Sequence, residues 1–389
     1  MGRRFTETSL RVLLFCGDMP RAVSRPTIAL ETGHAKLWML LIGVNHYDDP
    51  KLPSLQYSAI DCQGLSEALT EATQAFPEKT IRIHHDFAAE PATLERVRGS
   101  LEEILRSAQR QDTVLVYFSG HGILDSNRPV LCLSETRHDA LSRTGLSVVE
   151  LLEALGRCAA KHQVIWLDAC HSGGMTLRGM KTSFGLPNPT PQLMGMLGQK
   201  AAQSQGFYAL LSCDQSQQSW EFPELGHGVF TYFLMRGLRG EAADAKGTID
   251  ADGLYKYVYH QTLQYIDKTN QQLRLINQQK RGRGETQLQP EYPLQTPKRI
   301  VEGIGELVLG VKSAAILPQH PRQAIVVETL PNHRLSIELS KMLRRSGSFD
   351  LSYYPQPGKA WSSVRETIQS TLQATEIETA LIYLRGKLE

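Results

Sequence analysis

The segment VIWLDACHSGGM, residues 164–175, joins a strand-like run to a group of reactive side chains. It begins with four apolar or aromatic residues, which is typical of a strand that is buried on both faces of a parallel sheet. The run continues directly into Asp168, Cys170 and His171, and two glycines follow. A thiol placed between a carboxylate and an imidazole at a strand end suggests a nucleophile, so the rest of the chain must supply its partner.

The chain on either side of this segment alternates between strand-like and helix-like patterns. Strands are predicted over residues 36–45, 80–86, 113–120, 163–168 and 206–213. Helices are predicted over about 56–75, 91–109, 147–158, 226–240 and 250–268. This alternation predicts an α/β fold with a mostly parallel sheet and helices on both faces. In such a sheet the reactive groups gather at the carboxyl ends of the strands.

The composition indicates a globular protein and limits its partners. Apolar residues make up 41% and charged residues 21% of the chain, and the net charge is only +2, which argues against nucleic acid as the main partner. The basic run KRGRG (280–284) is interpreted as a solvated loop. Six scattered cysteines show neither metal-ligand spacing nor a disulfide framework, and most of them are expected to be reduced, buried thiols. The apolar run VLLF (12–15) is too short for a signal peptide or a membrane span, so we expect a cytoplasmic protein without a membrane partner.

Changes in composition divide the chain into four parts. Residues 1–35 are polar and irregular and are interpreted as an N-terminal extension. Residues 36–300 form the main domain, in which 173–206 is rich in Gly, Pro, Gln and Ser and is expected to be a mobile loop. Residues 301–321 are expected to be a linker. Residues 322–389 show a strand–helix–strand–helix–strand pattern, which predicts a small C-terminal α/β unit.

The partner of Cys170 is predicted to be His121. The third strand ends in SGHG (119–122), and neighbouring parallel strands lie about 4.8 Å apart, so His121 and Cys170 should meet at one edge of the sheet. His121 would lower the pKa of the thiol and later protonate the leaving amine. His171 is disfavoured because successive residues at a strand end point apart. The amides of Cys170 and Gly122 could hold a developing oxyanion.

Three motifs in this order resemble a known peptidase family. SGHG (119–122), DACHSGG (168–174) and ALLSCDQSQQSWE (209–221) look like the motifs of the metacaspases, specifically their bacterial orthocaspase branch, among the caspase-like cysteine peptidases. The resemblance covers roughly residues 36–268. It implies a caspase-like fold, with Cys170 as the nucleophile and His121 as the general base and acid. His121 precedes Cys170 by 49 residues, a spacing similar to that of caspases.

The resemblance also assigns residues to a specificity pocket. Asp168 matches a pocket position, Asp61 and Ser119 match two others, and Ser58 matches less closely. Asp214 either lines the same cleft or is a turn residue, and the carboxylates of Asp168 and Asp61 could instead be a helix cap or a surface group. Two carboxylates in a pocket favour a cationic side chain. We therefore expect protein or peptide substrates with Arg or Lys before the scissile bond, whereas true caspases require Asp there.

The sequence departs from the family pattern where many metacaspases bind calcium. The corresponding stretch, 123–145, has only Asp125, Glu135 and Asp139, which are well separated in sequence. Calcium needs several oxygen ligands that converge on one point. We therefore expect no cofactor and no metal site, with a calcium requirement as the alternative.

Self-processing is a further expectation from the resemblance. Arg178, Lys181 and Lys200 lie in the stretch 173–206 and are candidate autocleavage sites; the alternative is a loop that is merely flexible. Residues 1–35 could occlude the cleft as the pro-segment of a zymogen, or they could be a disordered terminus.

Two other functions are alternatives to a peptidase. The chain could be a catalytically latent signalling scaffold that binds a protein partner through residues 322–389, although an intact Cys/His pair argues against it. A flavodoxin-like nucleotide binder would fit the sheet. However, the first strand is followed by GVNHYDD (43–49) rather than by a glycine-rich phosphate loop.

Overall fold

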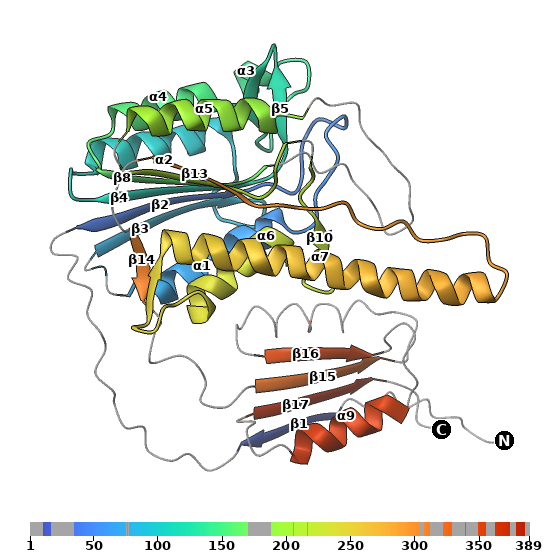
Figure 1. The fold of residues 1–389 in the computed structure, drawn as a ribbon. Coiled ribbons are helices and arrows are strands. Elements are labelled where there is room, and N and C mark those ends of the chain that lie inside the picture. Colours follow the sequence, from blue (N-terminus) through green and yellow to red (C-terminus); the bar gives the residue numbers. More distant parts are fainter. Residues whose placement is uncertain are drawn as a thin grey trace, which may run out of the picture. The chain divides into compact units, whose positions relative to one another are not determined.

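The computed structural model shows two compact units, each described by itself (Figure 1). One unit spans residues 28–313, and the other combines Met1–Thr27 with Ala314–Glu389. The residues that the structure describes are 11–16, 35–74, 76, 78–169, 188–204, 206–215, 217–302, 307–311, 322–328, 339, 349–354, 362–373 and 379–385.

A six-stranded sheet forms the centre of the larger unit. Its strands are β2 (Lys36–Gly43), β3 (Glu78–His85), β4 (Thr113–Ser119), β8 (His162–Asp168), β9 (Phe207–Leu211) and β13 (Lys298–Glu302). They lie in the order β13-β9-β8-β4-β2-β3, and only β13 is antiparallel to its neighbour. All five strands expected from the sequence are present and parallel, so the prediction of a mostly parallel α/β sheet is confirmed.

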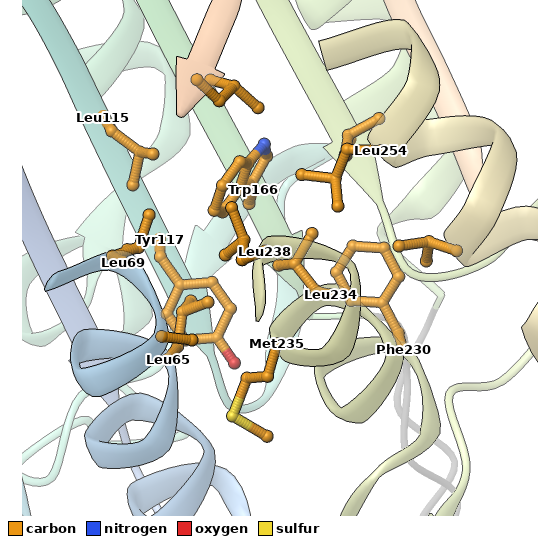
Figure 2. Close-up of a cluster of buried hydrophobic side chains, with 14 of the residues drawn as sticks. Leu65, Leu69, Leu115, Tyr117, Trp166, Phe230, Leu234, Met235, Leu238 and Leu254 are labelled. Atoms are coloured by element: carbon orange, nitrogen blue, oxygen red, sulfur yellow. The ribbon is translucent and has the colours of Figure 1, made fainter. Parts of the chain in front are cut away.

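Helices cover both faces of this sheet (Figure 1). One face carries α1 (Ser58–Ala72), α6 (Val229–Arg236) and α7 (Ala251–Gly282). The other face carries α2 (Leu94–Ser107), α4 (Val148–Arg157) and α5 (Thr190–Gln203). Successive strand residues point to opposite faces, so Leu115 and Tyr117 enter the first core while Val114 and Val116 enter the second. Figure 2 shows the first core, where Trp166 of β8 packs among side chains of the helices.

Short elements complete the larger unit. They are β5 (Gly122–Asp125), β6 (Arg128–Leu131), α3 (Leu141–Thr144), β7 (Leu146–Ser147), β10 (Glu221–Phe222), β11 (His227–Gly228), the π-helical turn η1 (Gly237–Glu241), β12 (Thr248–Asp250) and β14 (Val308–Val311). β5, β6 and β7 form a small sheet, β10 and β11 form a hairpin, and β12 pairs with β14. β14 lies within the stretch expected to be a linker, 301–321.

The stretch 173–206 is not a loop throughout, because α5 occupies residues 190–203. Its buried residues are Thr190, Leu193, Leu197 and Ala201. They recur every three or four positions, which is the spacing of one helix face. Gly195 and Gly198 lie on the open side, with no atom within 4 Å of where a Cβ would stand. These glycines weakened the helical pattern in the sequence, and the expectation of a loop over this part was wrong.

The polar composition of residues 269–300 suggests a boundary region, but the structure shows a helix and a returning chain there. α7 continues to Gly282, and the chain then returns beside it to form β13 (Figure 1). The side chain of Asn270 exchanges two 2.8 Å hydrogen bonds with the backbone of Tyr292, and Asn277 does the same with Gln289 at 2.7 and 2.8 Å. α7 has no buried residue after Asn270, so hydrophobic periodicity could not predict that the helix continues to Gly282.

The smaller unit contains a second sheet, built from both ends of the chain. Its elements are β1 (Arg11–Cys16), β15 (Arg322–Glu328), β16 (Phe349–Tyr354), α9 (Ser362–Gln373) and β17 (Thr379–Arg385). The strand order is β1-β17-β15-β16, with β1 antiparallel to β17 and the other pairs parallel. The N-terminal extension thus supplies a strand to this sheet, which its sequence did not indicate.

The structure tests two further expectations, one about the cysteines and one about membrane-spanning segments. Cys62, Cys132 and Cys158 are free thiols, as expected of most of the cysteines, whereas Cys213 after β9 is disulfide-bonded, which the cysteine spacing did not signal. Over the described part of the chain, no helix combines the length and the apolar character that crossing a membrane requires.

Gly43, at the end of β2, allows α1 to approach the sheet closely. A Cβ there would overlap the carbonyl oxygen of Ser58 and lie 2.6 Å from the Cβ of Cys62. We expect Gly43→Ala to lower the free energy of unfolding by about 2 kcal/mol or more, because backbone must move to admit the methyl group. Urea unfolding measures this.

Gly99→Ala is the matched control, since Gly99 lies within α2 and its Cβ position has no atom within 4 Å. There the same change should stabilise the protein by about 0.5–1 kcal/mol through helix propensity. Equal effects at the two positions would contradict the close approach.

Candidate active site

The carboxyl edge of the central sheet gathers four of the predicted pocket residues. Ser119 ends β4 and is the register partner of Asp168, which ends β8. On the other side Ser119 pairs with Gly43, against which the start of α1 packs. That first turn of α1 carries Ser58 and Asp61. All four side chains are buried, with at most 8% of their surface exposed. The sheet register and one helix start therefore bring these polar residues to the same edge.

His121 lies beside the two residues that precede Cys170. The amide of Gly120 donates a 3.2 Å hydrogen bond to the carbonyl of Asp168. On the other side, a Cβ at Gly122 would lie 2.7 Å from the carbonyl oxygen of Ala169. Both glycines flanking His121 are thus in close contact with the end of β8, and a side chain at Gly122 would push the two segments apart.

Three of the predicted site residues lie outside the described part of the chain: the nucleophile Cys170 and the autocleavage candidates Arg178 and Lys181. The pairing of Cys170 with His121 remains a prediction, based on the position of its neighbour Ala169. Lys200 is described and lies in the last turn of α5. A peptide bond within a helix must unwind before a peptidase can cut it, so the helical backbone disfavours Lys200 as an autocleavage site.

The imidazole of His121 is held by the segment that follows β2. Its Nε2 lies 2.7 Å from the carbonyl oxygen of Pro53. A carbonyl only accepts hydrogen bonds, so Nε2 carries the proton, and Nδ1 is the nitrogen that can take a proton from a thiol. Tyr47 stacks on the ring at 5.0 Å, and its hydroxyl accepts a 2.9 Å hydrogen bond from the His121 amide. Neither partner was anticipated: a backbone carbonyl leaves no side-chain pattern in a sequence.

The amide of Gly122, a predicted oxyanion donor, is not used in the pairing of β5 with β6. The amide of Cys132 donates a 2.8 Å hydrogen bond to the carbonyl of His121, which fixes the alternation of hydrogen bonds between β5 and β6. Gly122 falls at the next position, opposite Leu131, where the N–H points away from β6. The other expected donor, the amide of Cys170, lies outside the described residues.

Asp168 is buried and accepts hydrogen bonds from hydroxyl groups. Ser219 donates to Oδ1 at 2.6 Å and Thr231 donates to Oδ2 at 2.9 Å. The hydroxyl of Tyr117, 2.8 Å from that of Thr231, completes a chain of donors that ends at the carboxylate. Burial raises the pKa of Asp168, while hydrogen bonds from Ser219, Ser212 and Thr231 oppose this rise by favouring the charged form.

Asp61 is held by the β10–β11 hairpin. The Nδ1 of His227 lies 2.6 Å from Oδ1, and the amide of Gly228 donates to Oδ2 at 3.1 Å. Burial raises the pKa of Asp61 to about 6; His227 opposes the rise and the charge of Asp168 adds to it. A Cβ at Gly228 would lie 3.0 Å from Oδ2 of Asp61 and 3.3 Å from Oδ2 of Asp168. The carboxylates of Asp61 and Asp168 therefore both approach Gly228, and only glycine, which has no side chain, leaves room for them there.

Glu221 is a third carboxylate at this place and is not among the residues predicted from the sequence. It is the register partner of Gly228 in the hairpin, and it accepts hydrogen bonds from the amides of Gln56 and Tyr57 at 3.3 and 3.2 Å. Burial, with a contribution from the charge of Asp61, raises its pKa to about 7. Glu221 is the last residue of the motif ALLSCDQSQQSWE, so its place in that motif could have indicated a site residue. His227 lies outside every motif, and nothing in the sequence pointed to it.

Asp214 does not join this group. Its carboxylate forms a 2.8 Å ion pair with Lys298 of β13. Burial would raise the pKa of Asp214, but Lys298 and the amide of Gln215 outweigh it and hold the pKa below its ordinary value. Of the two roles left open for this residue, the structure favours the turn residue over the pocket.

The acidic residues considered for calcium are each engaged elsewhere. Glu135 accepts the first amide of α2, Asp139 pairs with Arg137, and Asp125 accepts the amide of Ser142. Among the residues that the structure describes, no group of three or more His, Cys, Asp or Glu side chains could hold a metal ion.

The His227–Asp61 contact leads to a prediction about titration. His227 is the largest influence that lowers the pKa of Asp61, so His227→Ala should raise that pKa above about 6. Carbon-13 NMR of labelled aspartate carboxyls, followed from pH 4 to 8, measures the midpoint. His260→Ala, on the outer side of α7, is the control and should leave it unchanged. An unchanged midpoint in His227→Ala would contradict the described contact.

Comparisons with known proteins place this geometry in context. A model of the caspase domain matches residues 36–287, more than half of the chain. No curated protein matches it. Solved structures with similarity include a structural-genomics protein from Geobacter sulfurreducens, with 17% identity, a TM-score of 0.44, and coverage of 69% of this chain and 94% of that one. Another is caspase-1 from Spodoptera frugiperda, with 15% identity, a TM-score of 0.42, and coverage of 76% and 98%.

Proposed function

Because the chain belongs to the caspase domain family, whose fold supports a cysteine peptidase function, we propose that it hydrolyses peptide bonds on the carboxyl side of Arg or Lys. In this proposal Cys170 is the nucleophile and His121 is the general base and acid. The metacaspase or orthocaspase branch of the family is part of the same proposal and rests on the motifs around these residues.

The proposed reaction follows from the hydrogen bonds of His121. The Cys170 thiol gives its proton to Nδ1, and the resulting imidazolium is stabilised by the Pro53 carbonyl at Nε2. The thiolate attacks the peptide carbonyl carbon, and the C=O electron pair moves to the oxygen, where the Gly122 amide donates to it. When the C–N bond breaks, His121 returns the proton to the leaving amine. Water, deprotonated by His121, then hydrolyses the thioester and releases Cys170.

The observation that carries the specificity is the set of three carboxylates around Gly228, of which Asp61 and Asp168 are buried and Glu221 is partly buried. The hydrogen-bond partners of Asp61, Asp168 and Glu221 described above are hydroxyls, amides and one imidazole. None of these partners has a permanent positive charge. Buried anions without a cation are costly, so a guanidinium or ammonium group from a substrate would supply what the pocket lacks.

Self-cleavage belongs to the same proposal. A peptidase with this specificity could cut its own chain after Arg178 or Lys181, between the strand that leads to the nucleophile and α5. Mass spectrometry of the purified protein would show new termini after one of these residues, and the Cys170→Ala variant would remain uncut.

The first test compares two fluorogenic peptides, one with Arg and one with Asp before the reporter. We expect cleavage of the Arg peptide only, reduced at least about 10³-fold in Cys170→Ala and in His121→Ala. The mechanism uses no metal, so EDTA should not change the rate. Faster turnover of the Asp peptide would refute the specificity. Loss of activity with EDTA would establish the calcium alternative, and no cleavage by the native chain under any condition would favour the latent scaffold.

The pH dependence of substrate binding tests the pocket separately. The pKa values of Glu221 and Asp61 are raised to about 7 and about 6, so these groups are charged above those values and neutral below them. We expect the KM for the Arg peptide to rise about tenfold or more as the pH falls from 8 to 5.5, because the attraction for the cation is lost.

Glu221→Gln is the control for this profile. Without that carboxyl group, the rise in KM should begin at a lower pH than in the native chain. A KM that does not change with pH in either protein would argue against a pocket made of these carboxylates.

A further inference from the structure

The segment between α7 and β13 reaches the pocket through one fully buried side chain, Gln295. Its Oε1 accepts a 2.9 Å hydrogen bond from the amide of Trp220. Its Nε2 donates to the carbonyl of Ser212 at 3.1 Å and to the hydroxyl of Ser219 at 3.0 Å. The orientation of the amide is unambiguous, because the Trp220 N–H can only donate and the Ser212 carbonyl can only accept. Gln295 therefore uses one acceptor and two donors at once.

This arrangement determines what the Ser219 hydroxyl does. A hydroxyl has a single hydrogen, and the oxygen of Ser219 already accepts from Gln295. Its hydrogen is therefore directed to Oδ1 of Asp168, at 2.6 Å. If Gln295 did not donate, the hydroxyl could rotate and donate elsewhere, and Asp168 would lose one of its donors.

The same segment is fixed to the chain around Ser219 at two further points. The indole nitrogen of Trp220 donates to the carbonyl of Pro293 at 2.9 Å, and the side chain of Gln217 bonds both the amide and the hydroxyl of Thr296. Residues 292–297 thus hold the connection between β9 and β10 in place by hydrogen bonds. These residues lie beyond residue 287, where the caspase domain match ends.

We infer that Gln295 is a positioning residue of the specificity pocket, which holds the Ser219 hydroxyl toward Asp168 and so keeps that carboxylate oriented for the cationic side chain of the substrate. The inference rests on the proposed function, since it assigns a role within the pocket proposed for Arg or Lys. Gln295 acts through Ser219 and makes no contact with the reacting atoms, so its effect should appear in substrate binding rather than in the chemical step.

The experiment measures kcat and KM for the Arg peptide at pH 8 in the full chain. Gln295→Met keeps the length of the side chain and removes its hydrogen bonds. We expect KM to rise about tenfold while kcat stays within about twofold. The isosteric Gln295→Glu keeps the acceptor for Trp220 but loses both donors at this pH, and it should raise KM in the same way if the Met variant does not fold.

A matched control separates positioning from general support. Gln217→Met removes hydrogen bonds between the same two segments, yet Gln217 makes none to Ser219 or Asp168. It should lower the melting temperature while leaving KM within about twofold of the native value. A KM rise in Gln217→Met equal to that in Gln295→Met would overturn the inference.

A double-mutant cycle tests the route through Ser219. Ser219→Ala alone should raise KM, and adding Gln295→Met to it should cause little further rise, because the hydroxyl that Gln295 orients is gone. If the two changes raise KM independently, so that their effects multiply, the inference is wrong. The Asp168→Asn variant distinguishes a failure of the proposed pocket from a failure of the role inferred for Gln295. If it leaves Arg cleavage intact, the proposed pocket is wrong; if it abolishes cleavage while Gln295→Met leaves KM unchanged, only the role of Gln295 is wrong.

Discussion

Two carboxylates buried at one end of a sheet must each find enough hydrogen-bond donors, and this requirement organises the chain that follows the sheet. Asp168 takes hydroxyl groups from Ser219 and Thr231, 51 and 63 residues further along the chain. Asp61 takes an imidazole and an amide from the β10–β11 hairpin, 166 and 167 residues away. These hydrogen bonds to Asp168 and Asp61 therefore form only when the chain after β9 has folded back over the sheet edge.

The sequence predicted the parts of this arrangement that local patterns encode. Buried strands have near-continuous apolar runs, so all five parallel strands were found and their carboxyl ends could be placed at one edge. This edge brings together Ser119 and Asp168, which are register partners. Asp61 could be assigned only through the resemblance to a known family, because a carboxylate in the first turn of α1 has the same local pattern as an ordinary helix-end charge.

What could not be predicted depends on contacts between distant segments. His227 and Gln295 are polar residues in polar surroundings, and only the fold shows that one reaches Asp61 and the other Ser219. The Pro53 carbonyl that orients His121 is backbone and has no sequence signal. The distal half of α7 packs no apolar face and is instead joined by Asn270 and Asn277 to the returning chain, so the usual helical period was missing.

β1, near the start of the chain, pairs with β17, near its end, over six residue pairs. A single backbone break at any point between residues 17 and 378 therefore leaves β1 on one fragment and β17 on the other. The fragments of a nicked chain would then travel together through a sizing column and separate only in denaturant. Nicking and dissociation would be two distinct events in this molecule, and the pairing of β1 with β17 would add to the strand pairing of the central sheet in holding the fragments together.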